Sequence, residues 1–389
     1  MTIELNGIGW DHPRGYDCLV GATEAFHAEH PDIRITWSKR SLRDFGEAPI
    51  DVLARRYDFI IIDHPFSGKA RQSGCLVDLG ALVPDTIADL MADEIGQSTR
   101  SYQYDGGVWG LPTDAVSQVA AYRPDLLAAH GHGVPATYDE VRRLAAGLRA
   151  AGLWIGVPSC PTDAICQVLS YASNLGHPPG AREGEFVPAD VLGDVLDILR
   201  ELLSLAHPAS VQSNPIQMFE RMSAGDEVAY VPLAFGYSNY ARKGESPLIR
   251  GADFAGPGAD PKAGALLGGA GCALSTRCRH LEAATSYLRW LHRPEVMSGV
   301  YLDAGGQPGR RSAWQDARVN EVASNFFADT FDTIQRAYLR PRFDGFVPFM
   351  EEAGIRVNDW LRGAGDKGAL VDWLRADFAR AFENSRQEA

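Results

Sequence analysis

Short apolar runs alternate with helical patterns along the first hundred residues. Residues 3–8 and 33–37 show the alternation of a half-buried β-strand, and residues 59–62 form a continuous apolar run. A helical pattern lies between the first two segments and ends at Pro31. Alternating strands and helices are typical of a parallel α/β sheet, and a run such as 59–62 is typical of a strand buried on both faces.

A second group of elements follows residue 112. Thr137 and Glu140 form a capping-box pair that predicts a helix from near Tyr138 to residue 152. Asn214 and Pro215 have the residue types of a helix cap and first helical position. Further strands are predicted at 154–157 and 228–233, and further helices at 191–203 and 281–291.

Length and charge indicate how many domains the protein has and which partners it is expected not to bind. A chain of 389 residues exceeds the roughly 250 to 300 residues at which a single core stops growing, so we expect two domains. The net charge of -13 opposes a nucleic acid or an anionic membrane surface as the partner. No apolar run approaches the roughly 20 residues of a membrane-spanning helix.

The sequence contains no motif for a cofactor or a metal ion. The six cysteines include no Cys-x-x-Cys pair, and we expect them to be mostly buried free thiols. The glycine-rich segment 268–271 lacks the spacing of a dinucleotide-binding loop, and Gly68-Lys69 is followed by Ala70 and not by Ser or Thr. We therefore expect no cofactor and no metal.

Five segments, in the order in which they occur, resemble the extracellular solute-binding proteins of ABC importers, in particular the large sugar-binding family 1 group. Asp105-Gly106-Gly107-Val108-Trp109-Gly110-Leu111-Pro112 is similar to the family's crossing into its second lobe. Val134-Pro135-Ala136-Thr137-Tyr138-Asp139-Glu140 is similar to its Pro-x-Thr-Trp-x-Glu helix start, with Tyr in place of Trp. The other segments are 26–35, 74–79, and 282–296 together with 306–308.

The resemblance implies a two-lobed α/β fold of the periplasmic-binding-protein-like type II, with a ligand cleft between the lobes. Lobe one would comprise residues 1–112 and 265–315, and lobe two residues 113–264 and 316–389. The implied function is a monomeric solute-binding protein of the venus-flytrap kind. It would capture a sugar, a polyol or an organic acid for ABC-type uptake and deliver it to the importer's membrane subunits.

Two alternatives stay open at this stage. The family implies an extracytoplasmic location, whereas residues 1–7 have the pattern of a strand and turn, which predicts a cytoplasmic protein if Met1 is the native start. A cytoplasmic enzyme on the same scaffold is the second alternative, although we lean against enzymatic activity. Such an enzyme would use an Asp-His pair or Cys160, whose pKa the amino end of a following helix could lower.

Candidate ligand-binding residues follow the predicted strands. Asp11-His12 and Asp63-His64 each precede a proline directly after the first and third strands, so both pairs should lie at one edge of the sheet. Strand-ending turns with locally bonded side chains are the alternative interpretation. The remaining candidates are Trp10 and Tyr237 for stacking, Arg14, Arg40 and Arg310 for an anionic group, and Asp114 for a hydroxyl.

Overall fold

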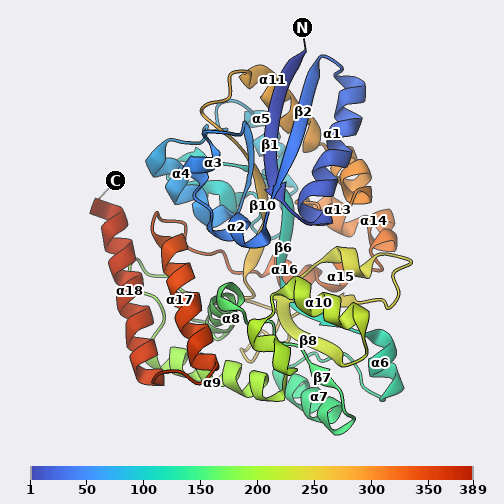
Figure 1. Ribbon diagram of the computed structural model, residues 1–389, viewed down its shortest axis with the longest axis vertical. Coiled ribbons are helices and arrows are strands. Elements are labelled where there is room, and N and C mark those ends of the chain that lie inside the picture. Colours follow the sequence, from blue (N-terminus) through green and yellow to red (C-terminus); the bar gives the residue numbers. More distant parts are fainter. Residues whose placement is uncertain (1, 388–389) are drawn as a thin grey trace.

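The computed structural model describes residues 2–387 and shows an α/β protein with two lobes stacked along its long axis (Figure 1). Met1, the expected start of lobe one, and residues 388–389, the expected end of lobe two, lie outside the described residues. The order of the strands in the main sheet is β2-β1-β3-β10-β6-β8-β7, with β9 paired to β6. The strands of both lobes are therefore linked by one hydrogen-bonded path.

Lobe one is built on three parallel strands at the amino end of the chain. β1 (Ile3–Trp10) pairs with β2 (Ile33–Arg40) on one side and with β3 (Phe59–Ile62) on the other. These strands confirm the predictions at 3–8, 33–37 and 59–62. The helices around them are α1 (Cys18–Glu29), α2 (Leu42–Glu47), α3 (Ile50–Leu53), α4 (Ser67–Ser73), α5 (Pro84–Ala92) and α11 (Leu281–Leu291).

Lobe two contains the strands β7 (Trp154–Ile155), β8 (Val228–Phe235) and β9 (Arg250–Ala252). Its helices include α6 (Pro124–Ala129), α7 (Tyr138–Ala150), α8 (Pro161–Asn174), α9 (Ala189–Leu205) and α10 (Pro215–Ala224). Both predicted helix starts are confirmed, because Thr137 and Asn214 each form a complete capping box. The predicted strand 154–157 is shorter than expected and ends two residues earlier.

Two long strands connect the lobes. β6 (Leu111–Tyr122) and β10 (Leu267–Leu274) pair antiparallel, and a register shift separates Ala270 from Gly271. The glycine-rich segment is therefore a strand, and its glycines allow close packing. A Cβ at Gly271 would lie 2.6 Å from the ring of Tyr102, so no side chain fits at this position.

The hydrophobic cores follow the two lobes. One core is built by residues within 5–111 and 270–301, and the other by residues within 120–266 and 343–378. A third cluster, which includes Ala115, Leu267 and Trp314, fills the region where the lobes join. The expected lobe boundaries near 112, 265 and 315 stay a prediction, which the membership of these cores supports.

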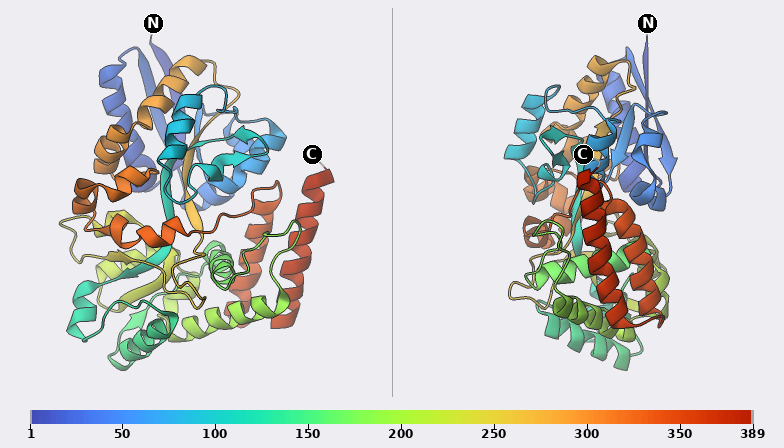
Figure 2. Two further views of the ribbon diagram at one scale, coloured as in Figure 1. Left: turned by 180° about the vertical axis from the view of Figure 1, so that it is seen from behind. Right: turned by 90° about the vertical axis from the view of Figure 1, so that its left-hand side faces the viewer.

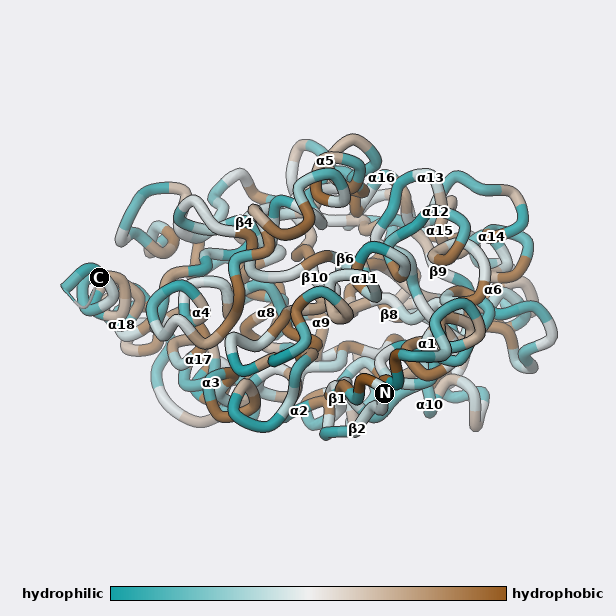
Figure 3. Tube along the Cα trace, turned by 90° about the horizontal axis from the view of Figure 1, so that it is seen from above, coloured by the Kyte–Doolittle hydropathy of each residue, from teal (hydrophilic) through white to brown (hydrophobic). Residues whose placement is uncertain are grey.

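The carboxyl-terminal part of the chain is helical. It comprises α12 (Pro294–Val296), α13 (Arg311–Gln315), α14 (Ala317–Val322), α15 (Phe326–Asp329), α16 (Phe331–Gln335), α17 (Phe346–Leu361) and α18 (Lys367–Gln387). Figure 2 shows α17 and α18 side by side along one flank of lobe two, and α17 packs against α8. Seen from above in Figure 3, hydrophilic stretches lie on the outside of the molecule, for example at α4 and α18. No helix within residues 2–387 has the length and apolar character needed to cross a membrane.

Candidate functional site

A cavity of about 490 Å³ lies between the two lobes. Lobe one contributes residues from the end of β1, from α2 and from the end of β3, and lobe two contributes the start of α8, the start of α10 and the end of β8. A volume of this size falls in the range of small-molecule sites. Its aromatic lining residues are Trp10, Phe45, Phe235 and Tyr237, and its charged ones are Arg14, Arg43, Glu47, Asp63, Asp163, Arg340 and Glu351.

Arg14, which follows β1 of lobe one, is held in place by contacts to the connecting strand β6 and to lobe two. Its Nε and Nη2 donate to the carboxylate of Asp114 at 2.7 and 2.6 Å, and its Nη1 donates to the carbonyl of Gly236 at 2.9 Å. The ring of Tyr237 lies 4.7 Å from the guanidinium carbon. Burial opposes the charge, but Asp114 raises the pKa of Arg14 above its ordinary value, so the guanidinium stays charged.

Asp63 forms a second buried ion pair at the cavity wall. Arg340 Nη2 donates to both carboxylate oxygens, at 2.7 and 2.6 Å, and the ring Nδ1 of His64 lies 3.2 Å from Oδ1. Burial opposes ionisation, but Arg340 and His64 hold the pKa of Asp63 below its usual range. Burial, and then the charge of Arg340, lower the pKa of His64 to about 4, so this imidazole is neutral at pH 7.

Two buried donors in the cavity wall have no hydrogen-bond partner within residues 2–387. They are Nε1 of Trp10 and Nε of Arg340, and both side chains are at least nine-tenths buried. The ring of Trp10 packs against Phe45, with centroids 4.7 Å apart. Unsatisfied buried donors are costly, and a bound ligand or water with acceptor oxygens would satisfy them.

Cys160 and Asp163 lie at the amino end of α8, where Cys160 is the residue before the first helical position. The Sγ of Cys160 donates to Oδ2 of Asp163 at 3.1 Å. Burial, and then the charge of Asp163, raise the pKa of Cys160 well above its usual range. The expectation that the helix end lowers this pKa is therefore wrong, because desolvation and a neighbouring carboxyl outweigh the helix dipole.

The structure places four of the ten predicted residues on the cavity wall, namely Trp10, Arg14, Asp63 and Tyr237. Trp10 does not follow the first strand as expected, since it is the last residue of β1 and is 4% exposed. Three others lie behind this wall as direct neighbours of lining residues: His12 against the ring of Tyr237, Asp114 on Arg14, and His64 on Asp63.

The other three candidates do not line the cavity. Asp11 is on the surface, where its carboxylate lies 2.8 Å from Lys39 Nζ, so the two Asp-His pairs have different partners and do not form one cluster. Arg40 is buried at the end of β2 and donates to the carbonyl of Ile61.

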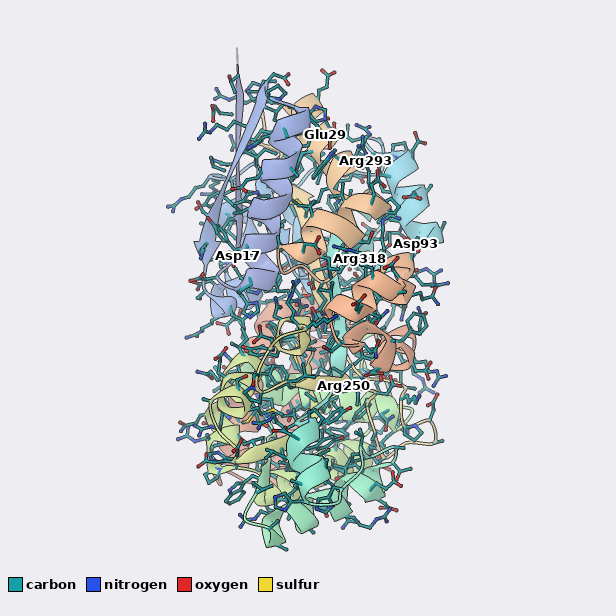
Figure 4. All side chains as sticks on the ribbon, turned by 90° about the vertical axis from the view of Figure 1, so that its right-hand side faces the viewer. Asp17, Glu29, Asp93, Arg250, Arg293 and Arg318 are labelled. Carbon is teal, nitrogen blue, oxygen red and sulfur yellow. The ribbon has the colours of Figure 1, made fainter. Side chains whose placement is uncertain are left out.

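Arg310 packs inside lobe one and is 1% exposed. Its guanidinium pairs with Asp89 in the last turn of α5 and with Asp93, which directly follows this helix. Figure 4 shows Asp93 on lobe one, above the join between the lobes. Arg310 is therefore not a cleft residue as expected, because two carboxylates and the carbonyl of His292 hold its guanidinium inside lobe one.

Several lining residues were not predicted from the sequence. Arg340 lies in an irregular segment between α16 and α17, where neither strand nor helix periodicity marks a position. Asp163 occupies the first turn of α8, where an acidic residue is the ordinary helix-start signal and gives no indication of a ligand. Phe45 and Glu351 were also missed. Within residues 2–387 no group of three or more His, Cys, Asp or Glu side chains could hold a metal ion.

A cavity lined by both lobes, with paired charges and aromatic rings at strand and helix ends, is the arrangement of a two-lobed solute-binding protein. Residues 22–326 match the family model of the bacterial extracellular solute-binding proteins, and the chain belongs to this family. The resemblance seen in the sequence is thus confirmed. A search of the curated proteins found no match.

Solved structures of this class have the same fold. Maltose-bound MalE3 of T. maritima aligns with a TM-score of 0.84 at 17% identity, over 98% of this chain and 100% of that chain. A solute-binding protein from Agrobacterium radiobacter K84 in complex with ribitol aligns with a TM-score of 0.79 at 19% identity, over 97% of this chain and 98% of that chain. A solute-binding protein from Thermotoga lettingae bound with α-D-tagatose aligns with a TM-score of 0.84 at 14% identity, over 98% of this chain and 100% of that chain.

Proposed function

We propose that the protein captures a small polar organic ligand, a sugar, a polyol or an organic acid, between its lobes for uptake by an ABC importer. The observation that supports this most is the interlobe cavity, where aromatic rings lie beside buried donors without partners. Rings provide stacking area for an apolar face, and unsatisfied donors favour a ligand rich in oxygen acceptors.

Closure of the lobes would be the signal to the importer. Within residues 2–387, the main sheet passes from lobe one to lobe two only through the paired strands β6 and β10. This narrow connection permits hinge motion between the lobes. The membrane subunits of an ABC importer would recognise the closed form. This function requires an extracytoplasmic location and fits a monomer that docks on the transporter with both lobes.

The enzyme alternative finds no support in the site. A nucleophilic Cys160 would need to form a thiolate, whereas burial raises the pKa of this thiol. The imidazole of His64 is buried and pairs with an Asp63 that Arg340 already engages, so it is held as a structural group.

Calorimetry and thermal-shift assays with maltose, ribitol, D-tagatose and D-gluconate test the proposal, because these probes sample the proposed ligand classes. A probe at 100 times its dissociation constant should stabilise the protein by about 2.7 kcal/mol. Phe45→Ala should weaken binding by about 1 to 2 kcal/mol through lost stacking. Phe331→Ala, at a half-buried ring outside the cleft, is the matched control. Equal binding by both variants would contradict the proposed site.

A further inference from the structure

The guanidinium groups that line the cleft all have carboxylate partners within the described residues. The three pairs are Arg14 with Asp114, Arg340 with Asp63, and Arg43 with Glu47. An acidic ligand would have to compete with one of these carboxylates. For Arg14 and Arg340, which are nine-tenths buried or more, this competition would leave a buried carboxylate without its cation. Each guanidinium in the cleft therefore already has its charge paired with a carboxylate, and Nε of Arg340 is left to donate to an acceptor oxygen of a ligand.

Asp163 is the opposite case, a buried carboxyl without a cation. It lines the cavity and is 6% exposed, and its hydrogen-bond partner among residues 2–387 is the thiol of Cys160, a weak donor. Burial raises the pKa of the Asp163 carboxyl to about 7, and the thiol offsets this only in part. A positively charged group of a ligand would supply the cationic partner that the protein does not provide for Asp163.

Two further carboxylates line the cleft. Glu351 of α17 lines it from lobe two, and Glu47 of α2 lines it from lobe one. Burial, and then the charge of Glu47, raise the pKa of Glu351, while Arg43 acts in the opposite direction. With the net charge of -13 for the whole chain, these carboxylates favour a cation over an anion in the cleft.

We propose that Asp163 selects the charge of the ligand, so that the cleft prefers a polar molecule with a protonated amino group over its neutral or acidic counterpart. The inference rests on the proposed function and narrows its ligand class. The ammonium group donates to the free oxygen of Asp163, while the hydroxyl and ring portions of the ligand contact the aromatic wall. A charge-assisted hydrogen bond of this kind is stronger than a neutral one.

Two matched sets of probes test the charge preference by calorimetry at pH 7. The cyclic set is D-glucosamine, D-glucose and D-glucuronate, and the acyclic set is 1-amino-1-deoxy-D-sorbitol, D-sorbitol and D-gluconate. In at least one set, the amino compound should bind about tenfold or more tightly than the neutral one, and the acid most weakly. A neutral or acidic compound that binds tightest in both sets would overturn the proposal.

Asp163→Asn identifies the residue responsible. The amide keeps the size of the side chain and an oxygen for the Cys160 thiol, so neutral compounds should bind as before while the amino preference falls to less than about threefold. Asp190→Asn removes the same charge from the exposed first turn of α9 and should keep the preference. A preference that survives in Asp163→Asn refutes the role of Asp163. If no probe binds at millimolar concentration, the proposed function fails as well, whereas tight binding of a neutral or acidic compound leaves that function intact.

Discussion

The carboxylate of Asp114 is fully engaged by Arg14 through two hydrogen bonds of 2.6 and 2.7 Å. Asp114 lies in β6, one of the two strands that connect the lobes, and Arg14 follows β1. The third donor of the guanidinium reaches Gly236 in lobe two. One arginine thus joins the end of the first strand, the connecting strand and the second lobe at the wall of the cavity.

Replacing Arg14 should lower the stability of the protein. Arg14→Met leaves Asp114 buried without a cation, so the free energy of unfolding in urea at pH 7 should fall by about 3 to 5 kcal/mol. Arg318→Met is the comparison, because its pair with Asp303 is about half exposed, at 52% and 49%, and such pairs contribute at most about 1 kcal/mol. Similar losses for the two variants would contradict the assignment of Arg14 as a structural anchor.

The pair between Asp63 and Arg340 should show strong energetic coupling. A double-mutant cycle with Asp63→Asn and Arg340→Met removes each partner separately and then both. Because Arg340 is buried, Asp63 is only 17% exposed and the two share two hydrogen bonds, we expect a coupling energy of about 1.5 to 3 kcal/mol in the free energy of unfolding. Additive effects of the two substitutions would show that the contact does not exist in solution.

Asp163 should reduce the stability of the unliganded protein at neutral pH. Its pKa is about 7 in the folded protein against an ordinary value of 3.8, so the folded state binds the extra proton and stability falls as pH rises from about 4 to 7. Asp163→Asn removes this loss. Its free energy of unfolding should exceed that of the parent by an amount on the order of 3 kcal/mol at pH 8 and by little at pH 4. A variant that is less stable at pH 8 would argue against this assignment.

His292 should make the protein sensitive to acid. Burial lowers the pKa of this side chain to about 4 from 6.5, so the unfolded state takes up a proton first as the pH falls. The contribution to stability is complete above about pH 6.5 and is lost as the pH falls toward 4, by up to about 3 kcal/mol. His292→Gln should flatten this part of a stability profile measured by urea unfolding. Parallel profiles of parent and variant would refute the prediction.

The strands and capped helices could be predicted from local pattern, whereas the site could be predicted only in part. Residues that follow or end the first sheet strands, such as Trp10, Arg14 and Asp63, do reach the cavity, because the carboxyl ends of parallel strands share one edge. Asp11 shares that position in sequence but alternates to the surface.

Arg340 is a site residue that no local sequence pattern indicates. Its partner Asp63 is 277 residues away in the chain, and the segment that carries Arg340 has no regular secondary structure. Contacts of this kind depend on how the lobes pack, which periodicity does not encode. Arg310 was misplaced for the same reason, since its pairing with Asp89 is a tertiary contact over 221 residues.

The paired strands β6 and β10 also determine how the molecule loses its structure. They are hydrogen-bonded to each other from Leu267 opposite Ser117 to Cys272 opposite Leu111, and each continues into the sheet of one lobe, β10 against β3 and β6 against β8. Neither lobe can melt without exposing backbone groups that belong to the other lobe's sheet. We expect the two lobes to unfold in one calorimetric transition, as a single cooperative unit despite the size of the chain.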